Sequence, residues 1–340
     1  MKIKHLELFC CHNCHNALKW QSYQTLGDDL IEGVFECNVC NNWYPITEEF
    51  GFFLDDNYVF AKEFRQLFLE KHQLSLNVSH NISSEDRFIS DKNVQISFFE
   101  EEASNYTQDH TLSKFVRLLD SDLINFWKPY FPEKGLSIEM GCGTGMRTLP
   151  LAELNNQHEF IGSDISTGMI RVAIKDAKKK GLNNVSFIVS DAEKLPLYSG
   201  LGDTVVGGGI LHHVPNPQIV IKEANRILNL KGHYIGIENN KTIFRFIFDL
   251  LQKIKPVWKE EAGTHPLISI SELKQWGYNE NINFIAKSRV FLPPQLINKL
   301  PNSISKLLFR LSESIGQNIP FIRQHGGMLF IAGTKINKNE

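Results

Sequence analysis

A glycine-rich stretch in the middle of the chain places the strongest constraint on its fold. Glu139-Met-Gly-Cys-Gly-Thr-Gly145 directly follows an apolar strand pattern and precedes a helical one. Glycines at such a turn let the backbone bend tightly and approach a ligand, while the N-terminus of the helix offers unpaired N–H groups. The stretch therefore predicts a ligand-binding loop. Dinucleotide-binding folds use a similar turn, so the loop alone leaves the cofactor open.

Strand and helix patterns alternate along the chain after residue 135. Strands are expected at 136–140, 159–163, 185–189, 203–206 and 233–237, with helices between them at 145–155, 168–180 and 217–229. Two further helices and two further strands are expected at 244–254, 271–276, 284–290 and 328–331. Such alternation implies parallel strands joined by right-handed crossovers. The prediction is an α/β fold built on a doubly wound, mostly parallel sheet.

The glycine spacing and the segments after the third and fourth strands narrow the choice of cofactor, whereas an acidic residue after the second strand fits both classes of cofactor. The glycine spacing is G-x-G-x-G, with Met146 where the dinucleotide pattern has its third glycine. Asp164 ends the second strand, about 20 residues downstream, as expected for a carboxylate that holds ribose hydroxyls. Asp191-Ala192 follows the third strand, and Gly208-Gly-Ile-Leu-His-His-Val214 follows the fourth. The order of these groups, rather than any one of them, carries the interpretation.

With these motifs in place, residues 110–240 resemble the class I, Rossmann-like S-adenosylmethionine-dependent methyltransferases, in the branch that acts on small molecules and quinones. The resemblance implies a seven-stranded methyltransferase sheet and S-adenosylmethionine as the cofactor. It implies that Asp164 binds the ribose diol and that Asp191 contacts the adenine amine. Leu197 departs from the aromatic residue common there. The positions that it assigns to the cofactor are Glu139, Gly141, Cys142, Gly143, Gly145, Asp164, Ile165, Asp191, Ala192 and Gly208.

His212 and His213 are the expected catalytic residues, because they follow the fourth strand where substrate meets cofactor. An imidazole titrates near neutral pH and can act as a general base for an acceptor that loses a proton. The alternative is that one histidine packs under the cofactor and the other caps a helix. The Pro-Pro-aromatic signature of amino-group methylation is absent at 207–213, which favours an O or C nucleophile of a small-molecule or lipid-linked acceptor and leaves N-methylation as an alternative. An RNA methyltransferase and a non-catalytic binding module remain the alternatives.

Two cysteine pairs near the N-terminus, Cys11-His-Asn-Cys14 and Cys37-Asn-Val-Cys40, predict a structural zinc site. They are separated by 22 residues, and Cys10 is left over. The stretch from Asn41 to Leu54 resembles the zinc-ribbon activator proteins that bind tRNA and translation-factor methyltransferases, here joined to the catalytic chain. We expect residues 1–55 to form a zinc ribbon that braces the catalytic part or recognises small molecules, with RNA recognition as the alternative.

The remaining segments are expected to cover the sheet. Residues 56–130 are interpreted as a linker and helical cap that places Tyr106 or His110 near substrate, and 131–340 as the methyltransferase domain. Residues 293–322 form an amphipathic insertion whose apolar face is expected on the core, with a lid or a membrane contact as the alternative. A net charge of −2 gives no overall attraction to nucleic acid or anionic membrane. Without a signal peptide or a spanning segment, a cytoplasmic protein is expected; the oligomeric state stays open.

Overall fold

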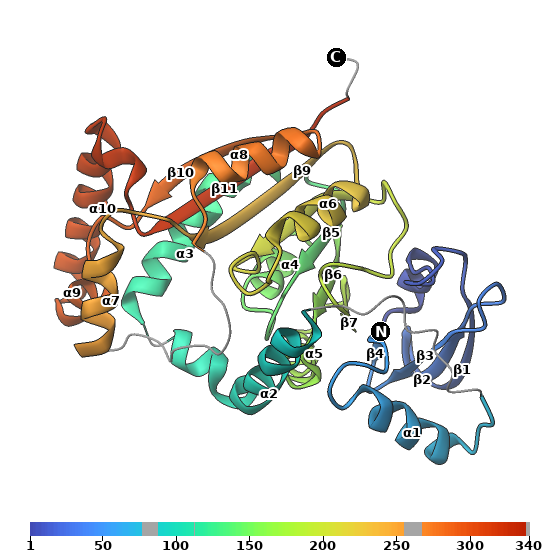
Figure 1. Cartoon of the computed structure of the whole chain (residues 1–340). Helices are drawn as coiled ribbons and strands as arrows, with labels where there is room; N and C mark the ends of the chain where they lie inside the picture. Colours follow the sequence, from blue (N-terminus) through green and yellow to red (C-terminus); the bar gives the residue numbers. More distant parts are fainter. Residues whose placement is uncertain (77–87, 112, 255–266, 338–340) are drawn as a thin grey trace.

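One continuous sheet runs through the computed structural model, which describes residues 1–76, 88–111, 113–254 and 267–337 (Figure 1). Within residues 131–340, the expected methyltransferase domain, which we call the catalytic part, the strand order is β7-β6-β5-β8-β9-β11-β10, and β11 is the strand that is antiparallel to its neighbours. The predicted α/β fold with a mostly parallel seven-stranded sheet is thus confirmed. The strands are β5 (Gly135–Met140), β6 (His158–Asp164), β7 (Val185–Val189), β8 (Gly202–Gly208), β9 (Leu228–Asn239), β10 (Ile282–Arg289) and β11 (Met328–Lys335).

The ribbon extends this sheet to eleven strands, which the sequence did not predict. Its antiparallel strands are β1 (Lys19–Leu26), β2 (Asp29–Glu36), β3 (Trp43–Thr47) and β4 (Phe50–Phe52). Strand β4 then pairs in parallel with β7, which places Phe50 opposite Phe187. Without this pairing β7 would leave a row of N–H and C=O groups unpaired at the sheet edge. The ribbon therefore belongs to the sheet, and its strand β4 pairs with the backbone groups of β7 that would otherwise lie at the edge.

Further contacts fasten the ribbon to the catalytic part. The backbone N–H of Cys10 donates to the carbonyl of Pro196 at 3.0 Å, and that of Lys2 donates to Ser186 Oγ at 2.9 Å. The two parts also share one buried apolar cluster, in which Phe9 and Phe53 of the ribbon lie with residues of β7 and the segment after it. Burial of this shared surface stabilises both parts together.

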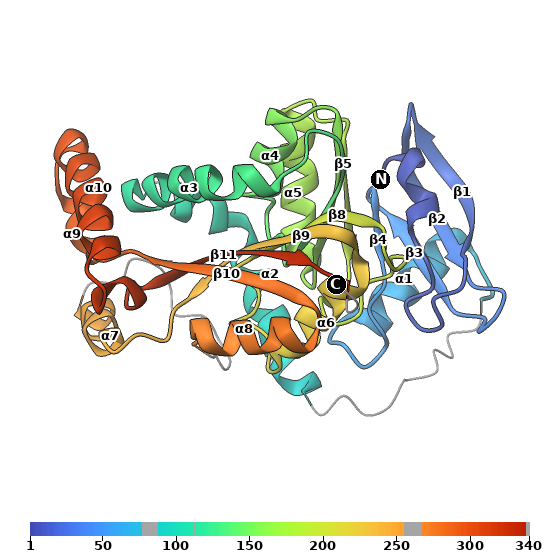
Figure 2. The same cartoon turned by 90° about the horizontal axis from the view of Figure 1, so that it is seen from above.

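Helices cover both faces of the catalytic sheet (Figure 2). Helices α6 (Pro217–Ile227) and α8 (Ile270–Asn279) pack on one face, and α4 (Thr148–Leu154), α5 (Thr167–Lys179) and α3 (Lys114–Trp127) pack on the other. Each helix turns one apolar stripe to the sheet; in α5 the buried positions recur at Met169, Ala173 and Ala177. Because neighbouring strand residues point to opposite faces, Val205 lies in one core and Val206 in the other.

Two helices, α1 (Ala61–His72) and α2 (Ile89–Thr111), lie within residues 56–130, which were interpreted as a linker and helical cap without bounds for these helices. Polar residues interrupt the apolar spacing in both. Helix α2 is held to the start of α5 by Glu100, whose Oε1 accepts hydrogen bonds from the hydroxyls of Ser166 and Thr167 and from the N–H of Gly168 at 2.9–3.0 Å. A carboxylate is favourable at a helix N-terminus. This contact fixes α2 over the C-terminal ends of the strands.

The last helical segment, α9 (Pro294–Lys299) and α10 (Asn302–Asn318), corrects one expectation. The face of α10 turned toward the protein carries Ser305, Phe309, Glu313 and Gly316, while Leu307 and Leu311 are exposed. Two polar side chains on the inner face have backbone partners: Ser305 Oγ donates to the carbonyl of Ile297 at 2.8 Å, and Glu313 Oε1 accepts from the N–H of Val290 at 2.8 Å. The prediction that the apolar face of this insertion packs on the core is therefore wrong for α10.

Candidate active site and metal centre

The glycine loop has the backbone conformation that its composition predicts. Gly141, Gly143 and Gly145 all have positive φ angles, of 69°, 53° and 77°, which other residues adopt only with strain. The loop is tied to the next strand because Cys142 N–H donates to the carbonyl of Ser163 at 2.8 Å. Gly143 N–H donates to Asp164 Oδ2 at 2.7 Å. The loop and the predicted ribose-binding carboxylate therefore form one unit.

A pocket opens above this unit, at the C-terminal ends of the central parallel strands, where open α/β sheets bind their ligands. Eight of the ten predicted cofactor residues line it. Helix α2 forms its opposite wall with side chains that the sequence had not assigned, apart from Tyr106. The lining residues are Lys92, Gln95, Phe99, Tyr106, Gly141, Cys142, Gly143, Thr144, Met146, Arg147, Asp164, Ile165, Met169, Ser190, Asp191, Ala192, Gly208, Gly209, Ile210, His213 and Val214. The side chain of His110 lies outside the described residues.

Asp164 presents a carboxylate to the pocket from the end of β6. Its Oδ1 accepts a hydrogen bond from the N–H of Ser166 at 2.9 Å, and its Oδ2 accepts the one from Gly143. Burial nevertheless raises the pKa of Asp164 to about 6, against the lowering effect of these N–H donors. The group thus gains or loses its proton close to physiological pH.

Asp191 is held from two sides by elements that precede the catalytic sheet. Tyr58, in the connection after β4, donates its hydroxyl to Asp191 Oδ2 at 2.5 Å, and Lys92 Nζ lies 2.7 Å from the same oxygen. Lys92 also contacts Glu193 Oε2 at 2.7 Å and is almost completely buried. A buried lysine is stable only with such partners. Neither Tyr58 nor Lys92 could be found from the sequence, because both belong to segments without a recognisable motif.

The other two predicted cofactor residues, Glu139 and Gly145, lie behind the pocket wall rather than on it. Glu139 is buried at the end of β5 and accepts a hydrogen bond from the Thr148 hydroxyl. Burial raises the pKa of Glu139 to about 7. Its Oε1 would lie only 2.8 Å from a Cβ at position 208, which explains why Gly208 carries no side chain there.

The two histidines have different surroundings. His213 lines the pocket, where its ring packs edge-on against Phe99 with the centroids 5.4 Å apart. His212 does not line it; its Nδ1 lies 2.7 Å from Oε2 of Glu238 at the end of β9. The two imidazole rings are neighbours, with centroids 4.0 Å apart.

Glu238 is a buried carboxyl group that the sequence had not singled out. Its Oε1 accepts a hydrogen bond from the N–H of Leu211 at 2.7 Å, which ties β9 to the loop that carries both histidines. Burial raises the pKa of Glu238 to about 8, so the group binds a proton at neutral pH more readily than a surface glutamate does. The sequence did contain one signal for Glu238: it is an acidic residue that follows the apolar run of Ile235 and Ile237 at the end of a strand.

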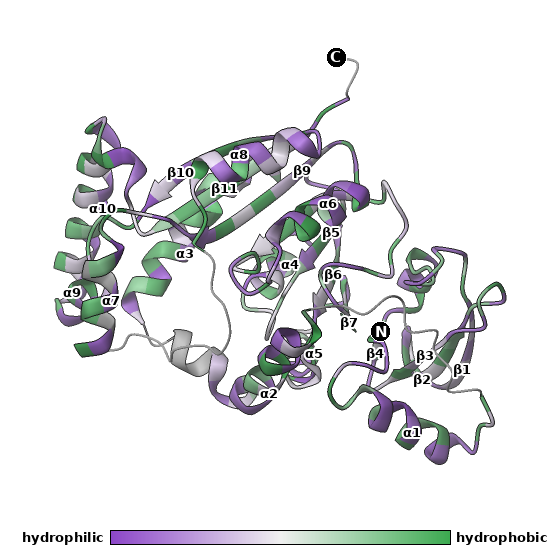
Figure 3. Cartoon of the chain, in the orientation of Figure 1, coloured by the Kyte–Doolittle hydropathy of each residue, from purple (hydrophilic) through white to green (hydrophobic). Residues whose placement is uncertain are grey.

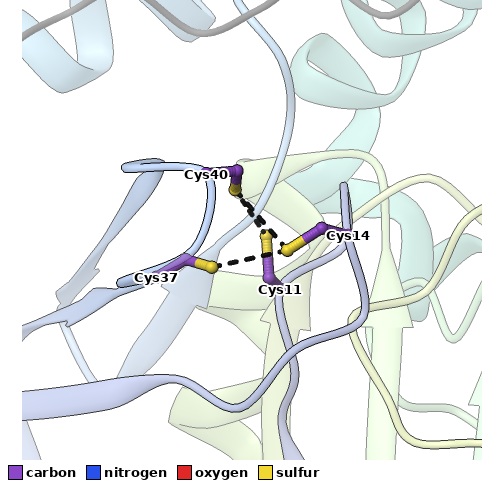
Figure 4. A group of neighbouring side chains, drawn as sticks. All are labelled: Cys11, Cys14, Cys37 and Cys40. Atoms are coloured by element: carbon purple, nitrogen blue, oxygen red, sulfur yellow. Dashed lines mark hydrogen bonds between the residues drawn. The ribbon is translucent and has the colours of Figure 1, made fainter.

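The four predicted zinc ligands come together in the ribbon, where Cys11, Cys14, Cys37 and Cys40 point toward one another (Figure 4). All four Sγ atoms lie within 4.8 Å of each other, and the shortest separations are 3.4–3.6 Å. Thiolates about 2.3 Å from one tetrahedral ion would be about 3.8 Å apart. The donor set and its spacing therefore fit zinc. His12 is not part of the set, because its Nε2 lies 2.8 Å from Asp55 Oδ1.

The fold and the pocket define a class I, Rossmann-like methyltransferase architecture. Comparison with known proteins agrees: residues 134–266 match the family model of a methyltransferase domain, and residues 2–49 match that of Trm112p-like proteins. One segment of the chain is thus similar to Trm112p-like proteins and another is similar to methyltransferase domains. Across the part of the chain that the structure describes, no helix is both long and apolar enough to cross a bilayer.

Curated relatives and a solved structure give the extent of the similarity. The chain is 33% identical over 124 residues to the demethylmenaquinone methyltransferase of Lactococcus lactis, which covers 35% of this chain and 49% of that protein. It is 28% identical over 181 residues to the protein of that name from Staphylococcus aureus, covering 48% and 69%. A chain in the complex between the Haloferax volcanii Trm112 methyltransferase activator and a methyltransferase superposes with a TM-score of 0.51 at 14% identity, covering 72% of this chain and 98% of that one. This last similarity concerns the fold.

Proposed function

We propose that the protein is an S-adenosylmethionine-dependent methyltransferase that acts on an O or C nucleophile of a small-molecule or lipid-linked acceptor. One observation carries the proposal: the glycine loop, Asp164 and Asp191 line a single pocket whose lining also includes His213. The similarity to demethylmenaquinone methyltransferases supports a quinone-type acceptor, and because the chain spans only about half of the Lactococcus relative, the acceptor is part of the proposal.

Different residues of the pocket would hold different parts of the cofactor. Asp164 would accept hydrogen bonds from the ribose hydroxyls, Asp191 would accept one from the adenine amine, and the glycine loop would let the backbone approach the methionine part. The cofactor, when bound, supplies an activated methyl group on a sulfonium. The protein then has to align the acceptor and exclude water, and α2, with Phe99 and Tyr106, closes that side of the pocket.

His213 is the proposed base, because it is the histidine that reaches the pocket. A ring nitrogen of His213 would take the proton of a phenol-type or activated carbon acceptor. We propose that His212 is a positioning residue. The hydrogen bond between His212 and Glu238 fixes the His212 ring, and this ring packs against the ring of His213. The four cysteines Cys11, Cys14, Cys37 and Cys40 would hold a structural zinc ion.

Transfer of a labelled methyl group tests the function and separates it from its alternatives. The zinc-replete protein would be incubated with methyl-labelled S-adenosylmethionine and, in parallel, reduced demethylmenaquinone, total RNA or a protein extract. We expect label in the organic extract of the first reaction. The Trm112p-like match of residues 2–49 motivates the RNA reaction, and label there would replace the small-molecule proposal. Cofactor binding without transfer to any acceptor would indicate a non-catalytic module.

Cofactor affinity is expected to rise with pH between about 5 and 7. The pKa of Asp164 is raised to about 6 in the cofactor-free protein, whereas hydroxyl donors favour the ionised carboxylate. Binding should therefore release a proton below that pH, and the dissociation constant should fall by up to about tenfold per pH unit and level off above the pKa. Calorimetry in buffers of different ionisation enthalpy measures both quantities. Asp164→Asn cannot titrate and should lose the Asp164 component of the slope; an unchanged slope in this variant would exclude Asp164 as its source.

A further inference from the structure

Helix α10 carries an apolar stripe on its outer surface that the fold does not use. Ile304, Leu307, Leu311 and Ile315 are spaced by three or four residues and therefore lie along one side of the helix. Their exposed fractions are 44%, 65%, 50% and 51%. The inner side of the same helix already packs on the protein through other residues. We call these four residues the α10 stripe.

More exposed apolar side chains gather at the same end of the molecule. Phe321 follows α10 and is 65% exposed, and α7 (Arg245–Ile254) exposes Phe246, Leu250 and Ile254 at 58–72%. Figures 1 and 2 both place α7, α9 and α10 together at the end farthest from the ribbon, and Figure 3 shows apolar residues on α7 and α10 there. Apolar surface of this extent marks an interaction site on a soluble domain.

The charge around the α10 stripe is positive, in contrast to the chain as a whole. Residues 291–327, all of them described by the structure, contain four basic residues and one acidic residue, which gives a formal charge of +3 against −2 for the whole chain. The basic residues are exposed: Lys299, Lys306, Arg310 and Arg323. The acidic one, Glu313, is buried and accepts a hydrogen bond from the N–H of Val290 at 2.8 Å. The segment therefore exposes cations and no carboxylate.

A hollow between α10 and α3, on the inner side of α10 and away from the stripe, contains further cations, of which Lys114 also donates to the carbonyl of Leu300 at 2.6 Å. Lys306 and Arg310 of α10 face Lys114 and Arg117 of α3 across it, and Asp122 is the acidic residue among those described as lining it. Asparagine and serine side chains also line it and can donate hydrogen bonds. Such a surface fits phosphate groups, because several cations and neutral donors converge on one space.

We propose that this end of the protein docks on a bilayer that contains anionic phospholipid. The α10 stripe enters the boundary between headgroups and acyl chains, and the cations beside it contact lipid phosphates, as in other interfacial amphipathic helices. A second copy of the chain fits this surface poorly, since a two-fold contact would place two like-charged faces against each other. The proposal concerns binding at a surface remote from the pocket and does not depend on the methyl acceptor.

Flotation with lipid vesicles tests the docking. The whole 340-residue chain, loaded with zinc, is expected to float with phosphatidylglycerol–phosphatidylcholine vesicles and to float far less with phosphatidylcholine alone or in high salt. Leu307→Ser/Leu311→Ser should weaken binding at least about tenfold. Lys306→Gln/Arg310→Gln should weaken it about fivefold for each cation removed and reduce the salt dependence. The control Leu154→Ser/Tyr278→Ser removes two large side chains elsewhere that are more exposed than Leu307 and Leu311, and it should bind as the parent does.

Two results would overturn the proposal. One is a parent protein that binds S-adenosylmethionine normally but does not float with anionic vesicles. The other is a stable dimer in light scattering that Leu307→Ser/Leu311→Ser dissociates, since the stripe would then belong to a second copy. Cofactor affinity, measured on every variant, should stay at the parent value. A variant that loses vesicle binding but keeps its cofactor affinity has lost docking alone, so the docking proposal and the proposed enzymatic function are tested separately.

Discussion

Replacement of one zinc ligand is expected to give the largest loss of stability in this chain. Cys40→Ser should abolish zinc binding and lower the thermal midpoint of the ribbon by about 10–20 °C or more, since a structural zinc site contributes about 10–16 kcal/mol of binding free energy in small domains. Ribbon strands alone bury too little apolar surface to replace it. Zinc content by atomic emission and unfolding by calorimetry measure the two effects.

The matched control is Cys10→Ala, which removes a neighbouring buried thiol outside the four-sulfur cluster. This variant should keep about one zinc per chain and lose only about 1 kcal/mol of unfolding free energy. Amide exchange should report the same difference at β4 and β7, because their pairing joins the ribbon to the catalytic sheet. Equal zinc content and equal midpoints in the two variants would refute the four-cysteine site.

His213→Ala is expected to cause the largest loss of turnover. Removing a general base lowers kcat by about 10²- to 10⁴-fold, whereas the affinity for S-adenosylmethionine should change little, because His213 lines the pocket without belonging to the glycine loop or the ribose carboxylate. The measurement is kcat with the acceptor identified by labelled transfer, together with cofactor affinity by calorimetry. A kcat within threefold of the parent would remove His213 from the mechanism.

Glu238→Gln tests the positioning role separately. Gln keeps an oxygen that can accept the hydrogen bond from Leu211 but cannot titrate. Since burial raises the pKa of Glu238 to about 8, the parent should lose a proton at this site, and with it folding stability, as the pH rises through that value. We expect the variant to flatten the pH profile of kcat near pH 8 and to lower kcat less than His213→Ala does. An unchanged profile would assign Glu238 a purely structural role.

The strongest sequence signals were those in which chemistry fixes both residue type and spacing. The three glycines at 141, 143 and 145 were predictable because only glycine adopts their φ angles without strain, and the cysteine pairs because one ion requires four thiolates. The central strands were predictable because parallel strands buried on both faces read as continuous apolar runs. These signals are local, and their consequences for the fold follow from general topology rules.

The missed features depend on contacts between distant segments. The ribbon's place in the sheet arises from the pairing of β4 with β7, about 137 residues apart, which no local pattern encodes. Lys92 and Tyr58 come close to the pocket by contacting Asp191, which is 99 and 133 residues away from them in the sequence. The spacing of the leucines in α10 is typical of a helix face that packs on a core. Such a pattern shows that a helix has an apolar side, but it does not show what that side packs against. In the structure, the more polar side of α10 packs against the rest of the protein.

Binding of the cofactor is the most direct test of the central claim. S-adenosylmethionine and S-adenosylhomocysteine should be titrated by calorimetry into the zinc-replete protein, into Asp164→Ala and into the surface control Asp176→Ala, whose carboxylate contacts only Lys179 among the described ion pairs. We predict micromolar binding to the parent and the control, and a loss of at least about 100-fold in Asp164→Ala, because two hydroxyl groups lose a charged acceptor. No binding to a folded, zinc-replete parent protein would contradict the account.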